Sequence, residues 1–150
     1  MSSDRVAIGS DHAGFKLSRV VGGFLEGLGF DVLYVGAVDE SPVDYPPICI
    51  EVGEHVTSGR VAWGVVLGGS GQGEAIAANK VPGVRAALCP TPRYAQLARE
   101  HNDANVLALG GRFLTDSEAL DVVRTWLKSD FAGGRHARRV NEIRTYETRR

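Results

Sequence analysis

Short apolar runs rich in β-branched residues alternate along the chain with longer amphipathic stretches. The apolar runs predict five strands, over residues 5–9, 31–35, 63–67, 84–88 and 105–109. The amphipathic stretches predict six helices, over residues 15–28, 48–57, 74–79, 92–100, 116–128 and 135–148. Strands that alternate with helices form parallel sheets covered by helices on both faces. The pattern therefore predicts an α/β protein with a three-layer, Rossmann-like fold, a five-stranded parallel sheet and one domain over residues 1–150.

The loops that follow three of the predicted strands form a candidate site. In open α/β sheets, ligands bind beyond the carboxyl ends of the strands. The loops to consider are therefore residues 10–14, 68–73 and 110–112, which hold many of the 19 glycines of the chain.

The loop 68–73 reads Gly-Gly-Ser-Gly-Gln-Gly and joins a buried strand to a helix. Its backbone amides, together with the positive end of the helix, suit an anion. The loop 68–73 does not match three known types of glycine loop. A P-loop needs Lys and Ser or Thr after Gly73, a dinucleotide-binding loop needs an acid about 20 residues further on, and a nucleophile elbow needs a glycine at position 72. A tight turn without a ligand remains the alternative.

Glu74 follows this loop in the first turn of the next helix. A carboxylate at that place is favoured by the helix dipole alone. It is also placed to act as a general base at the mouth of an anion-binding loop. The sequence leaves both interpretations open. Ser70 can donate a hydrogen bond there without being a nucleophile.

Polar residues also stand beside the first and fifth predicted strands. Asp11 and His12 end the first strand, where the acid could handle protons or simply cap a helix. His101 and Asn102 lie just before the fifth strand. The four histidines have no metal-ligand spacing, so no metal site is predicted.

The net charge of −1 hides an uneven distribution. Residues 135–150 carry +4, which leaves −5 on the rest of the chain. Arg135 and Arg139 share one helix face, and two guanidinium groups on one face suit a phosphate. A solvated basic helix and a nucleic-acid surface are the alternatives. The low sequence pI of about 6.4 and the lack of interleaved aromatic residues argue against nucleic acid.

The remaining composition is that of an ordinary folded domain, with 43% hydrophobic and 23% charged residues. No apolar run approaches the length of about 18 residues needed to span a bilayer, so no membrane association is expected. Cys49 and Cys89 stand far apart, which argues against a disulfide or zinc framework. A cytoplasmic location follows by default.

Taken together, six segments resemble the type B ribose-5-phosphate isomerase family, which includes the galactose-6-phosphate isomerase subunits. The segments are GSDHAG (9–14), DYP (44–46), GGSGQGE (68–74), AANKV (77–81), REHNDAN (99–105) and RH (135–136). They cover nearly the whole chain in order, and their combination is highly specific although each alone is weak.

The resemblance implies a cofactor-free aldose–ketose isomerase, a homodimer or tetramer, that interconverts ribose 5-phosphate and ribulose 5-phosphate through an enediolate. Many members carry a cysteine base at the position of Gly68, and members without it carry a glutamate at the position of Glu74. This chain therefore resembles the glutamate subtype. The resemblance also implies that the enediolate is stabilised by Ser70 and by the backbone amides of the loop, including those of Gly69, Gly71 and Gly73.

Further roles are implied residue by residue. His101 would assist opening of the sugar ring, Asp11 would handle a sugar hydroxyl and Asn102 would hold sugar hydroxyls. The implied phosphate clamp consists of His12, Arg112, Arg135 and Arg139. Because the family shares its site between subunits, His101, Asn102 and Arg112 are expected to act on the neighbour's ligand, and the helix at residues 135–148 is expected to contribute to the site or the dimer.

Other functions remain open at this point. The substrate could be another phosphosugar, either a tetrose such as erythrulose 4-phosphate or a hexose 6-phosphate, depending on the size of a pocket that Tyr45, Pro90, Thr91 and Tyr94 would line. A non-catalytic regulator that binds phosphosugars would keep the arginines and the glycine loop but would not need Glu74. A nucleic-acid-binding module would use the C-terminal helix.

Overall fold

The structure, a computed structural model, describes residues 4–149. Residues 1–3 and Arg150, which contributes to the charge of the C-terminal segment, lie outside the described part. Five strands form one parallel sheet in the order β2-β1-β3-β5-β4. The strands are β1 (Arg5–Ser10), β2 (Asp31–Gly36), β3 (Trp63–Gly68), β4 (Ala86–Leu88) and β5 (Val106–Gly110). The predicted five-stranded parallel sheet is therefore confirmed.

The order of the strands creates a switch point between β1 and β3. From β1 the chain moves to one side to form β2, and it then returns to the other side of β1 to form β3. The connections therefore leave these two strands in opposite directions, which opens a crevice at their carboxyl ends. The three inner strands are almost completely buried, as expected for strands with helices on both faces.

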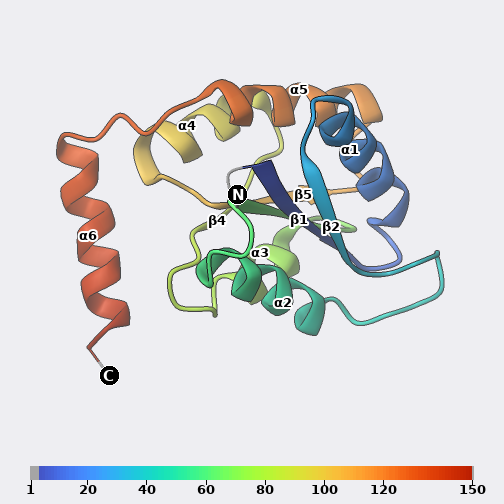
Figure 1. Ribbon diagram of the computed structural model, residues 1–150, viewed down its shortest axis with the longest axis horizontal. Coiled ribbons are helices and arrows are strands. Elements are labelled where there is room, and N and C mark those ends of the chain that lie inside the picture. Colours follow the sequence, from blue (N-terminus) through green and yellow to red (C-terminus); the bar gives the residue numbers. More distant parts are fainter. Residues whose placement is uncertain (1–3, 150) are drawn as a thin grey trace.

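Helices α1 to α5 cover the two faces of the sheet, and α6 lies apart from it (Figure 1). The helices are α1 (Phe15–Gly27), α2 (Tyr45–Thr57), α3 (Gln72–Ala78), α4 (Pro92–Asn102), α5 (Asp116–Lys128) and α6 (Arg135–Glu147). One apolar core lies between the sheet and α1, α4 and α5, and a second lies between the sheet and α2 and α3. The result is the predicted three-layer arrangement.

Helix α6 stands apart at one end of the molecule, beside α4 (Figure 1). Its buried side chains are His136 and Val140, whereas Ile143 and Tyr146 are exposed. Near its far end, the Glu147 Oε2 atom accepts a hydrogen bond of 2.8 Å from the backbone N–H of Gly83. The helix is thus fixed to the body at both ends, while much of its apolar surface is left uncovered in the single chain.

Most elements lie within two residues of their predicted bounds, and the shifts of α2 and β4 have identifiable local reasons. Helix α2 begins at Tyr45 rather than at Ile48, because Pro46 and Pro47 lie in its first turn, where the missing amide hydrogens have no helical partner. Strand β4 is shorter than predicted, because the Arg85 backbone N–H donates to the Asn105 side chain at 2.7 Å instead of joining the sheet.

Candidate active site

Three loops meet at the carboxyl edge of β1, β3 and β5. The backbone N–H groups of Gly111 and Arg112 donate to the carbonyls of Gly68 and Gly69 at 2.7 and 3.0 Å. On the other side, the Asp11 N–H donates to the Leu67 carbonyl at 3.3 Å. The loop after β3 is therefore held between the loops after its two neighbours, at the predicted place.

Glu74 lies inside this edge, in the first turn of α3, with a relative exposure of only 4%. A Cβ at position 68 would overlap the Glu74 carboxyl group, so the carboxylate occupies the space above Gly68 that a side chain would need. Its Oε1 atom is buried and has no hydrogen-bond partner within residues 4–149. Burial, and then the nearby Asp11 carboxylate, raise the pKa of Glu74 above its ordinary value.

The glycine loop turns around Gly71, which has a φ of +83° and caps α3. A Cβ there would lie only 2.7 Å from the Leu88 side chain, so the loop packs closely against the sheet. The Ser70 hydroxyl accepts a hydrogen bond of 3.3 Å from the Gln72 backbone N–H. Further along the loop, the Tyr45 ring lies against Gly73.

Asp11 is buried at the start of the crevice, with 7% exposure. Its Oδ1 atom accepts hydrogen bonds from the backbone N–H groups of Ala13 and Gly14, at 2.9 and 3.0 Å. These bonds close the turn that precedes α1, whose N-cap is Gly14 and not Asp11. The alternative that Asp11 is the N-cap of the helix is therefore wrong, because its carboxylate binds the turn before the helix.

His12 and Arg112 bring cationic and polar groups to the same edge. The Nδ1 atom of His12 accepts a hydrogen bond of 3.2 Å from the Val43 N–H, which leaves the ring proton on Nε2. The Arg112 guanidinium group lies over Gly69, since a Cβ there would be 3.2 Å from Nη1. A cavity of about 430 Å³ separates these residues, and Lys16 also lines it.

The other predicted residues lie at the opposite edge of the sheet. Helix α4 runs back from the carboxyl end of β4 to the amino end of β5, so His101 and Asn102, in its last turn, lie at the amino edge. The His101 ring stacks on that of His136, with centroids 4.2 Å apart and planes 10° apart. His136 lies in the first turn of α6, between Arg135 and Arg139.

One chain therefore holds two separate groups of the predicted residues. Glu74, Asp11, His12 and Arg112 lie at the carboxyl edge, whereas His101 and the α6 arginines lie at the amino edge. The resemblance placed Arg112 with His101 and Asn102, among the residues that reach the neighbour's ligand. Within one chain, Arg112 instead lies over Gly69, because β5 ends next to β3 and its loop reaches the same edge.

Several contributors to these two groups could not be read from the sequence. The Val43 amide contacts a histidine 31 residues away, and a backbone donor has no residue-type signal. The stack of His136 on His101 depends on how α6 returns to α4. The sequence pointed to both His101 and the RH pair at positions 135–136, but not to their contact.

Both cysteines are free and buried, and burial raises the pKa of each thiol to about 12. For Cys49 the nearby carboxylates of Glu74 and Asp11 add to this rise. Neither thiol forms a thiolate readily at neutral pH, so neither is suited to act as a base.

Within residues 4–149, no group of three or more His, Cys, Asp and Glu side chains is placed to hold a metal ion. No helix among those residues combines the length and apolar character needed to cross a membrane.

The fold and the site define a class of protein, a doubly wound α/β protein with a buried carboxylate at its switch point. Residues 6–143 match the family model described as Ribose/Galactose Isomerase. Ribose-5-phosphate isomerase B of Mycolicibacterium paratuberculosis is 43% identical over 145 residues, which is 95% of this chain and 91% of that protein.

Solved structures agree with this match. Ribose-5-phosphate isomerase B of Clostridium thermocellum has a TM-score of 0.94 and 49% identity, over 95% of this chain and 97% of that one. The enzyme of Mycoplasma genitalium, with bound ribulose 5-phosphate, has a TM-score of 0.93 and 39% identity, over 97% of each chain. The chain belongs to the ribose/galactose isomerase family, and the prediction that it is an isomerase is confirmed.

Proposed function

We propose that the chain interconverts ribose 5-phosphate and ribulose 5-phosphate, with Glu74 as the base. The observation that carries this proposal is the buried carboxyl group of Glu74, which fills the space above Gly68 at the switch point of the sheet. The relatives named ribose-5-phosphate isomerase B support the substrate, and one of them was solved with ribulose 5-phosphate bound.

The reaction moves a proton between two adjacent carbons. Glu74 removes the proton from C2 of the open-chain aldose, which leaves an enediolate across C1 and C2, and returns that proton to C1. The C1 oxygen gains a proton and the C2 hydroxyl loses one, so the aldehyde becomes a ketone. A single carboxylate can reach both carbons. Its raised pKa makes it a stronger base than an exposed glutamate.

The negative charge of the enediolate needs hydrogen-bond donors that are in place before the reaction. In this proposal the donors are the Ser70 hydroxyl and backbone N–H groups of the loop, including those of Gly69, Gly71 and Gly73. The close packing of Gly71 against Leu88 and Leu109 supports this role, because it holds the loop in one shape.

The phosphate and the sugar ring need the residues of both edges. His12, through Nε2–H, and Arg112 hold the phosphate from the carboxyl edge. Arg135 and Arg139 complete this clamp, while His101 opens the ring and Asn102 holds sugar hydroxyls. Because these four lie at the amino edge of their own chain, a second copy supplies them in a homodimer or tetramer.

Residues 1–150 act as one isomerase domain, with the C-terminal helix completing the site of the partner copy. The enzyme works in the cytoplasm on a phosphorylated sugar, without a cofactor or a nucleic-acid partner.

Turnover of a panel of phosphosugars by the purified chain tests this function. We expect the highest kcat/KM with ribose 5-phosphate, and lower values with a tetrose 4-phosphate and a hexose 6-phosphate. One carbon unit changes discrimination by only about 1–3 kcal/mol, so a preference for another member of the panel would reassign the substrate and keep the chemistry. Binding without turnover of any member would instead favour a non-catalytic regulator.

A further inference from the structure

The turn that ends α4 has an unusual backbone. Asp103 is the only non-glycine residue within residues 4–149 with a positive φ, at 48°. Such a left-handed residue commonly ends a helix, and it is usually glycine or, less often, asparagine. An aspartate adopts this conformation at a cost in strain, which persists only where the surroundings hold it. The contacts of the Asp103 side chain must therefore offset this strain.

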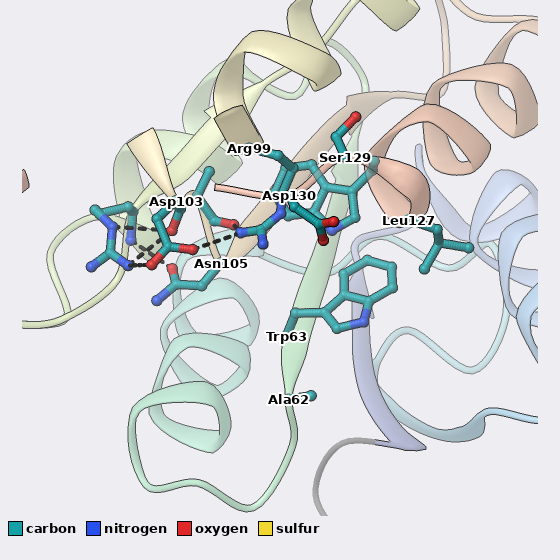
Figure 2. Close-up of a pocket in the computed structure, with 11 residues that line it drawn as sticks. Ala62, Trp63, Arg99, Asp103, Asn105, Leu127, Ser129 and Asp130 are labelled. Atoms are coloured by element: carbon teal, nitrogen blue, oxygen red, sulfur yellow. Dashed lines mark hydrogen bonds and ion pairs between the residues drawn. The ribbon is translucent and has the colours of Figure 1, made fainter. Parts of the chain in front are cut away.

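Two arginines hold the Asp103 carboxylate from opposite sides. Arg99 Nη1 lies 3.0 Å from Oδ1, and Arg85 Nη2 lies 3.5 Å from Oδ2. The two arginine side chains are largely buried, with exposures of 22% and 13%. Figure 2 shows Arg99, Asp103 and Asn105 together on the wall of a cavity of about 410 Å³ at this edge of the sheet.

Arg85 also binds the end of the α4 backbone. Its Nη2 donates to the Asp103 carbonyl at 2.8 Å, and its Nε donates to the Asn102 carbonyl at 3.0 Å. The last carbonyls of a helix have no partner within it, so a cation is well placed there. Arg99 Nη1 adds a bond of 2.7 Å to the Ala104 carbonyl.

Arg85 is itself fixed by the strand that follows the turn. Its backbone N–H donates to Asn105 Oδ1 at 2.7 Å, and Asn105 Nδ2 donates to the Gly83 carbonyl at 2.9 Å. The segment before β4, the turn after α4 and the start of β5 are thus joined by one continuous set of hydrogen bonds. This set leaves the last turn of α4 little freedom to rotate.

We propose that Asp103 and Arg85 are positioning residues that aim His101 at the substrate. His101 lies in the last turn of α4, two residues before Asp103, so the conformation of this turn decides where its side chain points. The inference rests on the proposed function, which assigns ring opening to His101. It accounts for the strained aspartate and for two largely buried arginines that the reaction does not otherwise use.

The test replaces Asp103 without adding backbone strain. Asp103→Gly accepts the positive φ but loses the carboxylate, and Asp103→Asn keeps one oxygen for Arg99. The matched control is Asp121→Asn, which removes an exposed pair on α5 with a distance of 2.9 Å to Arg124. We expect Asp103→Gly to lower kcat by about 10-fold with KM nearly unchanged, because small displacements of reacting groups cost this much or more. The control should retain its kcat.

A double-mutant cycle with His101→Ala separates positioning from stability. If Asp103 acts through His101, the double variant should have the same kcat as His101→Ala alone. A normal kcat in folded Asp103→Gly and Asp103→Asn, or losses that multiply in the double variant, would overturn the inference. A normal kcat in His101→Ala would instead refute the role that the proposed function gives to His101. Arg85→Lys, which keeps the charge but not the planar fork, should behave like Asp103→Gly.

Discussion

Glu74 and Gly68 form a pair in which the absence of one side chain makes room for another. The carboxyl group lies where a Cβ at position 68 would be, and it is buried beside Asp11. Both conditions destabilise the charged carboxylate and so raise its pKa. A carboxylate placed in this way is costly for stability but useful as a base.

Replacing Glu74 by glutamine removes the base and keeps the shape of the side chain. We expect Glu74→Gln to lower kcat by at least about 10²-fold, the lower end for general acid–base catalysis. Binding of the substrate should largely survive, because the proposed phosphate clamp is untouched. Steady-state kinetics and a binding titration check this. Near-normal turnover would contradict the assignment of the base.

The same variant should change stability in a pH-dependent way. The pKa of Glu74 is raised in the folded state above its ordinary value of 4.5. The folded chain then binds this proton more tightly than the unfolded chain, so the free energy of unfolding falls as the pH rises through the range between the two pKa values. Glu74→Gln removes this loss, and its Tm should exceed that of the wild type at neutral pH. The difference should shrink as the pH is lowered towards 4.5, and a variant less stable at neutral pH would contradict the account.

At this scale the sequence predicted where the polar residues of the carboxyl edge lie, but not what surrounds them. Loops after parallel strands identified Asp11 and the region of Glu74 from position alone. The sequence could not decide whether Glu74 is only an acid favoured by the helix dipole or a general base. That choice depends on the burial of Glu74 and on the space above Gly68. Those quantities follow from how α3 packs.

Among the elements, α3 depends most on the glycine loop that precedes it. Gly71 ends the loop with a positive φ and lies against Leu88 and the backbone of Leu109. The direction of α3, and with it the place of Glu74, is therefore set by a residue without a side chain.

Substitution of Gly71 by alanine should impair both stability and catalysis. The left-handed backbone alone costs about 1–2 kcal/mol for a residue with a Cβ. The added atom would also lie 2.7 Å from Leu88 Cδ1 and would push the loop away from the sheet. Thermal unfolding and the kcat of the folded fraction are the measurements.

Gly59→Ala is the matched control for Gly71→Ala. Gly59 has a similar φ of +79°, but nothing lies within 4 Å of the place of its Cβ. This variant should lose stability and keep kcat. Equal kcat in the two variants would show that the Gly71 packing does not position Glu74.

The elements themselves were largely predictable, since helix α5 has the predicted bounds. Its cap was not identified, because Thr115 lies one residue outside the periodic pattern and forms a capping box with Glu118. The start of α2 was placed too late, because prolines end helices in most positions but are tolerated in the first turn. Such boundaries depend on single residues and not on periodicity.

In the whole molecule, the sheet separates the two groups of proposed site residues. Glu74 and Arg112 lie at the carboxyl edge, and His101 and Arg135 belong to elements that meet at the amino edge. The sequence already pointed to this separation, because His101 directly precedes the fifth strand whereas Glu74 follows the third, and the strands were predicted to be parallel. In the proposal, two copies place opposite edges together and complete each site.

Mixing two inactive variants tests this account most directly. Glu74→Gln and His101→Ala should each be nearly inactive as purified proteins. When they are unfolded together and refolded as an equal mixture, half of the dimers are hybrids, and each hybrid has one site with both Glu74 and His101 intact. The mixture should therefore regain about one quarter of wild-type activity. No regain, with hybrid dimers demonstrated by mass spectrometry, would contradict a shared site built on Glu74.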